Sequence, residues 1–154
     1  ASKNKKGLRA GVINAEDPSA KLFESDIAHP LTYGVKTGEV RAADIKSTTT
    51  GSDFTVKNPA YKDQQLKIHV NLPGSFNIYN ALAAVGVGLA LKMKPEQIEQ
   101  GIAALKSVEG RMTAIEEGQP FSVVVDYAHT PDSFEKLFKV VLKDEDCCHE
   151  PGGY

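Results

Sequence analysis

The stretch best suited to chemistry is the junction between a valine-rich run and an amphipathic segment. Phe121–Val125 is apolar and β-branched, which predicts a buried strand of the parallel type. Asp126, Tyr127 and His129 follow it directly. Ligands bind beyond the carboxyl ends of strands in open α/β sheets, so a carboxylate and an imidazole here suit a nucleotide or phosphate site. The same side chains could instead only cap and hydrogen-bond a tight strand–helix turn.

A helix is predicted immediately after this junction. Thr130 can cap it, Pro131 suits its first position, and Asp132 and Glu135 favour the positive end of its dipole. Apolar residues then recur at helical spacing: Phe134, Leu137, Phe138, Val141 and Leu142. A strand–turn–helix unit would therefore position Asp126 and His129.

A pair of amides marks a second candidate site. Phe76–Met93 is nearly apolar all round, which predicts a buried helix, and Gly86 and Gly88 indicate close approach of another backbone. Asn77 and Asn80 lie three residues apart on one face of the first turn. Buried amides need hydrogen-bond partners. These are either local backbone groups or the edge of a purine base, because an amide both donates and accepts.

The first part of the chain predicts a strand followed by a short helix. The strand is residues 11–14, and the helix lies around Ser19–Glu24 with Leu22 and Phe23 facing inward. Three polar residues lie at the junction, namely Asn14, Glu16 and Asp17. Their types and place favour N-capping over a ligand site.

Residues 31–71 predict short strands separated by turns. The expected strands are Leu31–Val35, Val40–Thr48, Phe54–Val56 and Leu66–Val70. Their alternation and Gly and Asn-Pro turns suggest an antiparallel meander appended to an α/β core. His69 falls on the polar face of the last strand, which indicates a solvated surface residue.

A second helix and a new unit follow. The helix opens at Pro95, carries an apolar stripe of Ile98, Ile102 and Leu105, and is expected to end near residues 109–110. Arg111 comes next, and then two strands, 112–116 and 121–125, joined by the turn 117–120. These features predict a domain boundary near residue 110, with one domain over 1–109 and another starting at 110–154.

Composition excludes several classes of protein. Hydrophobic residues are 41% and charged residues 25%, as in a globular chain that buries a core. The net charge of -2 argues against a nucleic-acid binder, and no apolar run approaches the roughly 20 residues of a membrane span. Cys147 and Cys148 are adjacent, which fits a reducing, cytoplasmic setting. With His149 they lack the spacing of a zinc site, so no metal site is expected.

Several stretches together resemble the Mur ligases of peptidoglycan synthesis. They are VINAEDPSAKLF, LTYGV, PGSFNIYNALAAVGVGLAL, VEGRM and VVVDYAHTPDSFEKL, and they cover roughly residues 10–143. They are most similar to the branch that adds the third stem-peptide residue to UDP-N-acetylmuramoyl-L-alanyl-D-glutamate. DYAHTPD is the most specific piece, because folylpolyglutamate synthetases usually carry a D-G-A-H version and the alanine-adding branch ends in His-His-Pro.

The resemblance implies an α/β fold made of two partial domains. The first is the second half of a central ATP-binding domain, a mixed sheet with an antiparallel meander and helices. The second is the first strands and helix of a Rossmann-like domain that binds the incoming amino acid.

The resemblance also implies a reaction and its requirements. ATP phosphorylates the substrate carboxylate, and the amino acid, either diaminopimelate or lysine, attacks the acyl phosphate. This needs Mg²⁺ and a phosphate loop, and the sequence contains no GxxxxGK[ST]. In the family those parts precede this portion, so the chain alone is expected to be inactive and to bind neither ATP nor Mg²⁺ tightly. The expected partners are UDP-MurNAc-dipeptide and an amino acid, with no nucleic acid and no membrane, in the bacterial cytoplasm.

The resemblance further implies a nucleotide site with six members: Asn77, Asn80, Arg111, Asp126, Tyr127 and His129. The two amides would lie near adenine, and Asp126 would bind the ribose hydroxyls with the two ring side chains close by. Arg111 would reach ribose or phosphate, and its place at the domain boundary suits delivery on domain closure.

Two alternatives stay open. One is a non-catalytic binding or interaction module that retains half of a ligase fold. The other is a ligase of the same superfamily acting on a folate or cyanophycin-like substrate, against which the DYAHTPD segment weighs. In either case, exposed strand edges are expected to favour self-association.

Overall fold

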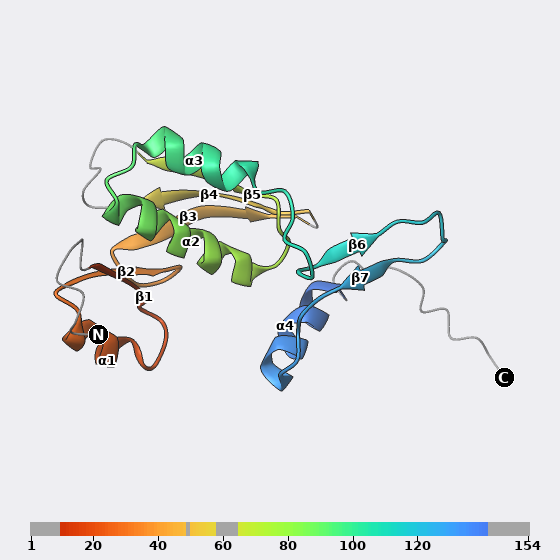
Figure 1. Ribbon diagram of the computed structural model, residues 1–154, viewed down its shortest axis with the longest axis horizontal. Coiled ribbons are helices and arrows are strands. Elements are labelled where there is room, and N and C mark those ends of the chain that lie inside the picture. The colour runs from red at the N-terminus through yellow and green to blue at the C-terminus, as the bar shows by residue number, and fades with distance from the viewer. Residues whose placement is uncertain (1–9, 49, 58–64, 142–154) are drawn as a thin grey trace.

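The computed structural model describes residues 10–48, 50–57 and 65–141 of the chain. They form a five-stranded sheet of order β1-β2-β3-β4-β5, a separate two-stranded sheet of β6 and β7, and four helices (Figure 1). In chain order the elements are β1 (Ala10–Asn14), α1 (Ala20–Asp26), β2 (His29–Gly34), β3 (Val40–Ser47), β4 (Ser52–Lys57), β5 (Leu66–Val70), α2 (Ser75–Ala90), α3 (Pro95–Ala104), β6 (Thr113–Ile115), β7 (Val123–Val125) and α4 (Pro131–Val141). The tail with Cys147, Cys148 and His149 lies outside the described residues.

The five-stranded sheet is mixed. Strands β3, β4 and β5 pair antiparallel, which confirms the expected meander. The prediction was wrong for the strand at 31–35, because β2 pairs parallel with both β1 and β3. Only two residues of β2, Tyr33 and Gly34, pair with β3, whereas five residues of β1 pair with β2. Turn residues alone do not distinguish this arrangement from a hairpin.

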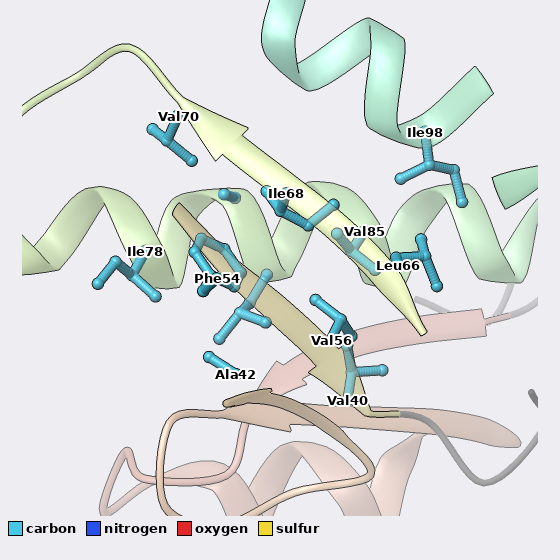
Figure 2. Packing of buried hydrophobic residues seen from close by; sticks show 12 residues of the cluster. Val40, Ala42, Phe54, Val56, Leu66, Ile68, Val70, Ile78, Val85 and Ile98 are labelled. Atoms are coloured by element: carbon cyan, nitrogen blue, oxygen red, sulfur yellow. The ribbon is translucent and has the colours of Figure 1, made fainter. Parts of the chain in front are cut away.

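One apolar core joins the sheet to α2 and α3. Alternate side chains of β3, β4 and β5 point toward α2, as Figure 2 shows, because successive strand residues face opposite sides of a sheet. Leu66, Leu82 and Val85 are fully buried at its centre. The opposite face of β5 carries Lys67 and His69, both exposed, as the alternation predicts.

The two glycines of α2 make room for side chains. A Cβ at Gly86 would lie 2.6 Å from Cγ1 of Val12, and one at Gly88 would lie 2.8 Å from the Ile98 side chain. The expected close approach is present, but the prediction of a neighbouring backbone was wrong. The helix also ends at Ala90, earlier than Met93, and Lys92 has a positive φ of 57°.

The inward orientation predicted for two residues of α1 was wrong. Leu22 and Phe23 are 72% and 59% exposed, whereas Ala20 is 5% exposed. A helix of seven residues presents one narrow side to β1, and the small Ala20 occupies it. Hydrophobicity alone could not decide which side faces the sheet.

Helix α3 begins at Pro95 as predicted, but its predicted end near residues 109–110 was wrong. It stops at Ala104, and Leu105 is extended. The Asn71 side chain donates its Nδ2 hydrogens to the carbonyl oxygens of Ala103 (2.9 Å) and Leu105 (3.0 Å), which satisfies groups that end a helix. Gly110 does have a positive φ of 69°, in the turn before β6.

The strand–turn–helix unit is present, although the nature of its strand differs from the prediction. Strand β7 pairs antiparallel with β6, and its three valines are 37–48% exposed, so a buried parallel strand at Phe121–Val125 was wrong. Valine favours any strand, and its burial depends on the partner. The N-cap is confirmed, since Oγ1 of Thr130 accepts the N–H of Ser133 at 3.2 Å. No helix within the described ranges is long and apolar enough to cross a membrane.

Candidate functional site

Asp126 lies directly after β7 and joins two backbone segments. Its Oδ2 accepts the N–H of Met112 at 2.9 Å, and its Oδ1 accepts the N–H of Ala128 at 2.8 Å. Met112 has a positive φ of 51°, an uncommon conformation for a residue with a side chain. Asp126 therefore stabilises the strand–helix turn, which is one of the two roles that its position predicts. Each carboxylate oxygen keeps a second lone pair, which could accept a hydroxyl of a ligand.

A cationic and aromatic row lies beside this carboxylate. The guanidinium of Arg111 is 5.3 Å from the centroid of the Tyr127 ring, a cation–π geometry. The rings of Tyr127 and His129 meet edge to face at 4.9 Å, and Nδ1 of His129 lies 2.9 Å from the carbonyl oxygen of Tyr127. The structure thus brings Arg111, Asp126, Tyr127 and His129 together around one strand end.

The two amides at the start of α2 bind each other. Asn77 is 8% exposed and donates from Nδ2 to the carbonyl oxygen of Pro73 at 2.7 Å. Asn80 donates from Nδ2 to Oδ1 of Asn77 at 3.1 Å. Within the described ranges the Oδ1 of Asn80 accepts no hydrogen bond, and no hydrogen bond joins this pair to Asp126 or Arg111. Asn77 therefore has a local backbone partner, as one of the two alternatives predicted. The Oδ1 of Asn80 can still accept a hydrogen bond from a ligand.

An apolar cavity of about 450 Å³ lies beside this amide pair. It is bounded by α2, α3 and the end of β5, with Leu72, Ala84 and Ile102 among its lining residues and Asn77 and Asn80 as polar members. Ligand sites are commonly apolar with a few polar groups that fix orientation. A flat heterocycle with a polar edge matches this combination.

Glu16 holds together three segments that are distant in sequence. Its carboxylate accepts the N–H groups of Lys36 (2.5 Å) and Thr37 (3.1 Å) and the hydroxyl of Tyr79 (2.7 Å). Burial alone would raise the pKa of Glu16, but the hydrogen bonds from Tyr79 and from backbone N–H groups outweigh it and hold the pKa below its ordinary value. Burial, followed by the bond to Glu16, raises the pKa of Tyr79 to about 12.

Sequence reasoning considered Glu16 only as a capping residue and did not find this role. Its partners are 20 to 63 residues away, so no local pattern indicates them. The N-capping expectation itself was wrong, because Ser19 is the N-cap residue of α1 and makes no side-chain capping bond. The neighbouring side chains instead bond N–H groups of the turn before the helix. Oδ1 of Asn14 accepts the N–H of Glu16 at 3.0 Å, and Oδ1 of Asp17 accepts the N–H of Ser19 at 2.8 Å.

The described residues offer no metal-binding group of three or more His, Cys, Asp or Glu side chains. The acidic residue of the candidate site, Asp126, already accepts two backbone N–H groups.

Comparisons with known proteins agree with one another. The model of the Mur ligase middle domain matches residues 2–88. A UDP-N-acetylmuramyl-tripeptide synthetase of Roseiflexus sp. (strain RS-1) is 43% identical over 141 residues, which are 88% of this chain and 27% of that protein. The UDP-N-acetylmuramoyl-L-alanyl-D-glutamate–2,6-diaminopimelate ligase of Halalkalibacterium halodurans is 36% identical over 86% of this chain and 27% of that protein.

The fold comparison finds the same architecture in a solved structure. MurF from Acinetobacter baumannii has a TM-score of 0.78 at 22% identity, over 90% of this chain and 30% of that one, and this likeness shows the fold alone. The chain spans about a quarter of the length of the relatives it matches in sequence. The mixed sheet, its helices and the matched sequence together show that the chain belongs to the Mur ligase family.

Proposed function

We propose that this chain is part of an ATP-dependent, amide-forming ligase that acts on UDP-N-acetylmuramoyl-L-alanyl-D-glutamate. The names of its relatives support this assignment, and that from Halalkalibacterium halodurans specifies 2,6-diaminopimelate as the added amino acid. Because the chain covers only 27% of each relative, the complete enzyme would contain further segments. These would supply the phosphate loop, which this sequence lacks, and the Mg²⁺ site.

The share of the reaction assigned to this chain is binding of the base and sugar of the nucleotide. The single observation that carries it is the group of Arg111, Asp126, Tyr127 and His129 around one strand end. In the proposal, Asp126 accepts the ribose hydroxyls through its unused lone pairs. Arg111, which lies on Tyr127, turns toward a phosphate or the ribose when the two domains, 1–109 and 110–154, close on each other.

The amide pair takes the base in this proposal. Asn80 would meet a donor and acceptor edge such as that of adenine, while Asn77 holds its orientation. The apolar cavity next to them would receive the ring itself. ATP, when bound, supplies the phosphoryl group that activates the substrate carboxylate.

The ligase proposal is tested by assaying ADP release and tripeptide formation. We expect the full-length polypeptide that contains this sequence to couple 2,6-diaminopimelate to UDP-MurNAc-L-Ala-D-Glu with ATP. We expect no measurable ATPase activity from the 154-residue chain alone, since no phosphate loop holds the β- and γ-phosphates. Turnover by the purified chain that Asp126→Ala abolishes would contradict the second expectation.

A non-catalytic module is the alternative function. In this alternative the chain is a binding or interaction module that retains half of a ligase fold. The sequence encoded upstream of this chain decides between the ligase and the non-catalytic module. A GxxxxGK[ST] motif there supports the ligase, and its absence supports the module.

We also propose that the isolated chain self-associates through the free edge of β1. The outer edge of β5 is covered, because Oε1 of Glu99 accepts the N–H of Lys67 at 2.7 Å and Asn71 binds the end of α3. In the described part of the chain β1 pairs only with β2, so its other edge can accept a strand. Light scattering should show an apparent mass that rises with concentration. A monomer across a wide concentration range would contradict this.

A further inference from the structure

A hydrogen-bonded relay crosses the exposed face of the sheet. Nδ1 of His69 on β5 lies 2.8 Å from Oδ1 of Asp53 on β4, and the two residues are register partners. Nε2 of His69 lies 3.1 Å from Oδ1 of Asn71. Asn71 in turn donates to the carbonyl oxygens of Ala103 and Leu105. The relay therefore runs from β4 to the end of α3.

The partners of this relay select one protonation state of His69. The orientation of the Asn71 amide is fixed, because only its NH₂ group can donate to two carbonyl oxygens. Its Oδ1 must then face Nε2 of His69, while the carboxylate of Asp53 faces Nδ1. Both ring nitrogens meet acceptors, so only the doubly protonated imidazolium satisfies both contacts. In a neutral ring with its proton on Nδ1, the lone pair of Nε2 would face a lone pair of the Asn71 Oδ1, and the two would repel each other.

The far end of the relay belongs to the proposed nucleotide site. Leu105 and the neighbouring Leu72 both line the cavity next to Asn77 and Asn80. Leu105 is also the first residue after α3, where the connection toward Arg111 begins. Asn71 therefore holds one rim of the cavity and the start of the segment that carries Arg111.

We propose that His69 is a positioning residue that, in its protonated form, fixes the end of α3 through Asn71 and releases it when it loses its proton. The effect on nucleotide binding rests on the proposed function, but the effect on α3 does not. Above the titration midpoint of His69, Asn71 loses its orienting partner, and the rim formed by Leu105 loosens. The proposed site would then bind a nucleobase more weakly at pH 8 than at pH 6.

The charged groups on the neighbouring elements either favour the protonated form of His69 or do not lie opposite its imidazole. Asp53 on β4 is the nearest, and Lys46 on β3 lies opposite Asp53 rather than opposite the imidazole. Lys67 lies two residues before His69 on the same face, and Glu99 of α3 accepts its backbone N–H. The hydrogen bond to Asp53, followed by that to Asn71, raises the pKa of His69 above its ordinary value. Its stabilising contribution is complete below the unfolded-state pKa and is lost as pH rises through the folded-state pKa.

NMR spectroscopy of the ¹⁵N-labelled chain tests the relay without any nucleotide. The imidazole signals of His69 and the backbone amide signals of residues 104 and 106, which follow the two acceptor carbonyls, are recorded from pH 5 to 9. We expect all of them to titrate with one midpoint above about 6.5, the ordinary value for histidine. Amide signals that do not move with the imidazole would overturn the proposal.

Two variants, Asp53→Asn and Asn71→Ser, separate a relay from a merely structural contact. Asp53→Asn should lower the shared midpoint toward the ordinary histidine value, because the carboxylate is replaced by a neutral amide. Asn71→Ser should leave His69 titrating while the signals of residues 104 and 106 cease to follow it. Unchanged signals along α2, which carries neither substituted residue, confirm folding in both. Amide signals that still follow His69 in Asn71→Ser would also overturn the proposal.

Titration of the full-length polypeptide that contains this sequence with ADP at pH 6 and pH 8 then addresses the nucleotide site separately. Tighter binding at pH 6, lost in Asp53→Asn, supports the coupling. Coupled amide titration without ADP binding supports the relay and contradicts the proposed nucleotide site. ADP binding that is equal at both pH values overturns the coupling between the relay and the site.

Discussion

Replacing Gly51 with Ala is expected to lower the free energy of unfolding by about 3 kcal/mol, the upper part of the usual range for overpacked sites. A Cβ at this position would lie 2.0 Å from the carbonyl oxygen of Val70. The obstacle is backbone, held by the pairing of Ser52 with Val70, so no side-chain rotation can relieve it. Urea denaturation followed by circular dichroism measures the change.

Gly101→Ala is the matched control for this variant. Gly101 lies within α3, and nothing lies within 4 Å of the place its Cβ would occupy. The same chemical change should there stabilise the protein by about 1 kcal/mol, since alanine is the better helix former. Equal denaturation midpoints for the two variants would contradict the steric explanation.

Asp126→Ala is expected to weaken ADP binding by the full-length polypeptide about 10- to 100-fold, which corresponds to about 1.5–3 kcal/mol for hydrogen bonds to a charged group. The change removes the carboxylate proposed to meet the ribose. It also releases the N–H groups of Met112 and Ala128, so the turn that carries Tyr127 would loosen. Isothermal titration calorimetry measures the affinity, and amide hydrogen exchange at Met112 reports the turn.

Asp132→Ala provides a control six residues away. Asp132 pairs with Lys136 at 2.7 Å on the exposed surface of α4, where both side chains are more than half exposed. Exposed ion pairs of this kind contribute little to stability, so the affinity of Asp132→Ala for ADP should stay within about twofold of that of the unsubstituted polypeptide. If Asp126→Ala and Asp132→Ala bound ADP equally well, Asp126 would have no part in the site.

Local signals in the sequence predicted local structure well. The cap at Thr130, the start of α3 at Pro95 and the alternation along β5 were all evident, because each depends on residues within one turn or one strand. The grouping of Arg111 with Asp126 was expected through the family resemblance. Periodicity and spacing alone left both residues without a partner.

The features that the sequence did not show depend on partners far along the chain. The direction of β7 and the exposure of its valines depend on its pairing with β6, and the parallel arrangement of β2 depends on its pairing with β1 and β3. The end of α3 is set by Asn71, more than 30 residues earlier. The pairing of His69 with Asp53 requires the register between β4 and β5, which alternation does not define.

The three-way contact of Glu16 has a consequence for the order of folding. Its carboxylate reaches Lys36, Thr37 and Tyr79 only after β1, β2 and α2 have come together. Such a contact is absent while the chain is still assembling, so it contributes little to the rate of folding. Interactions that form late mainly slow unfolding. We therefore expect the contacts of Glu16 to lengthen the lifetime of the folded sheet rather than to speed its formation.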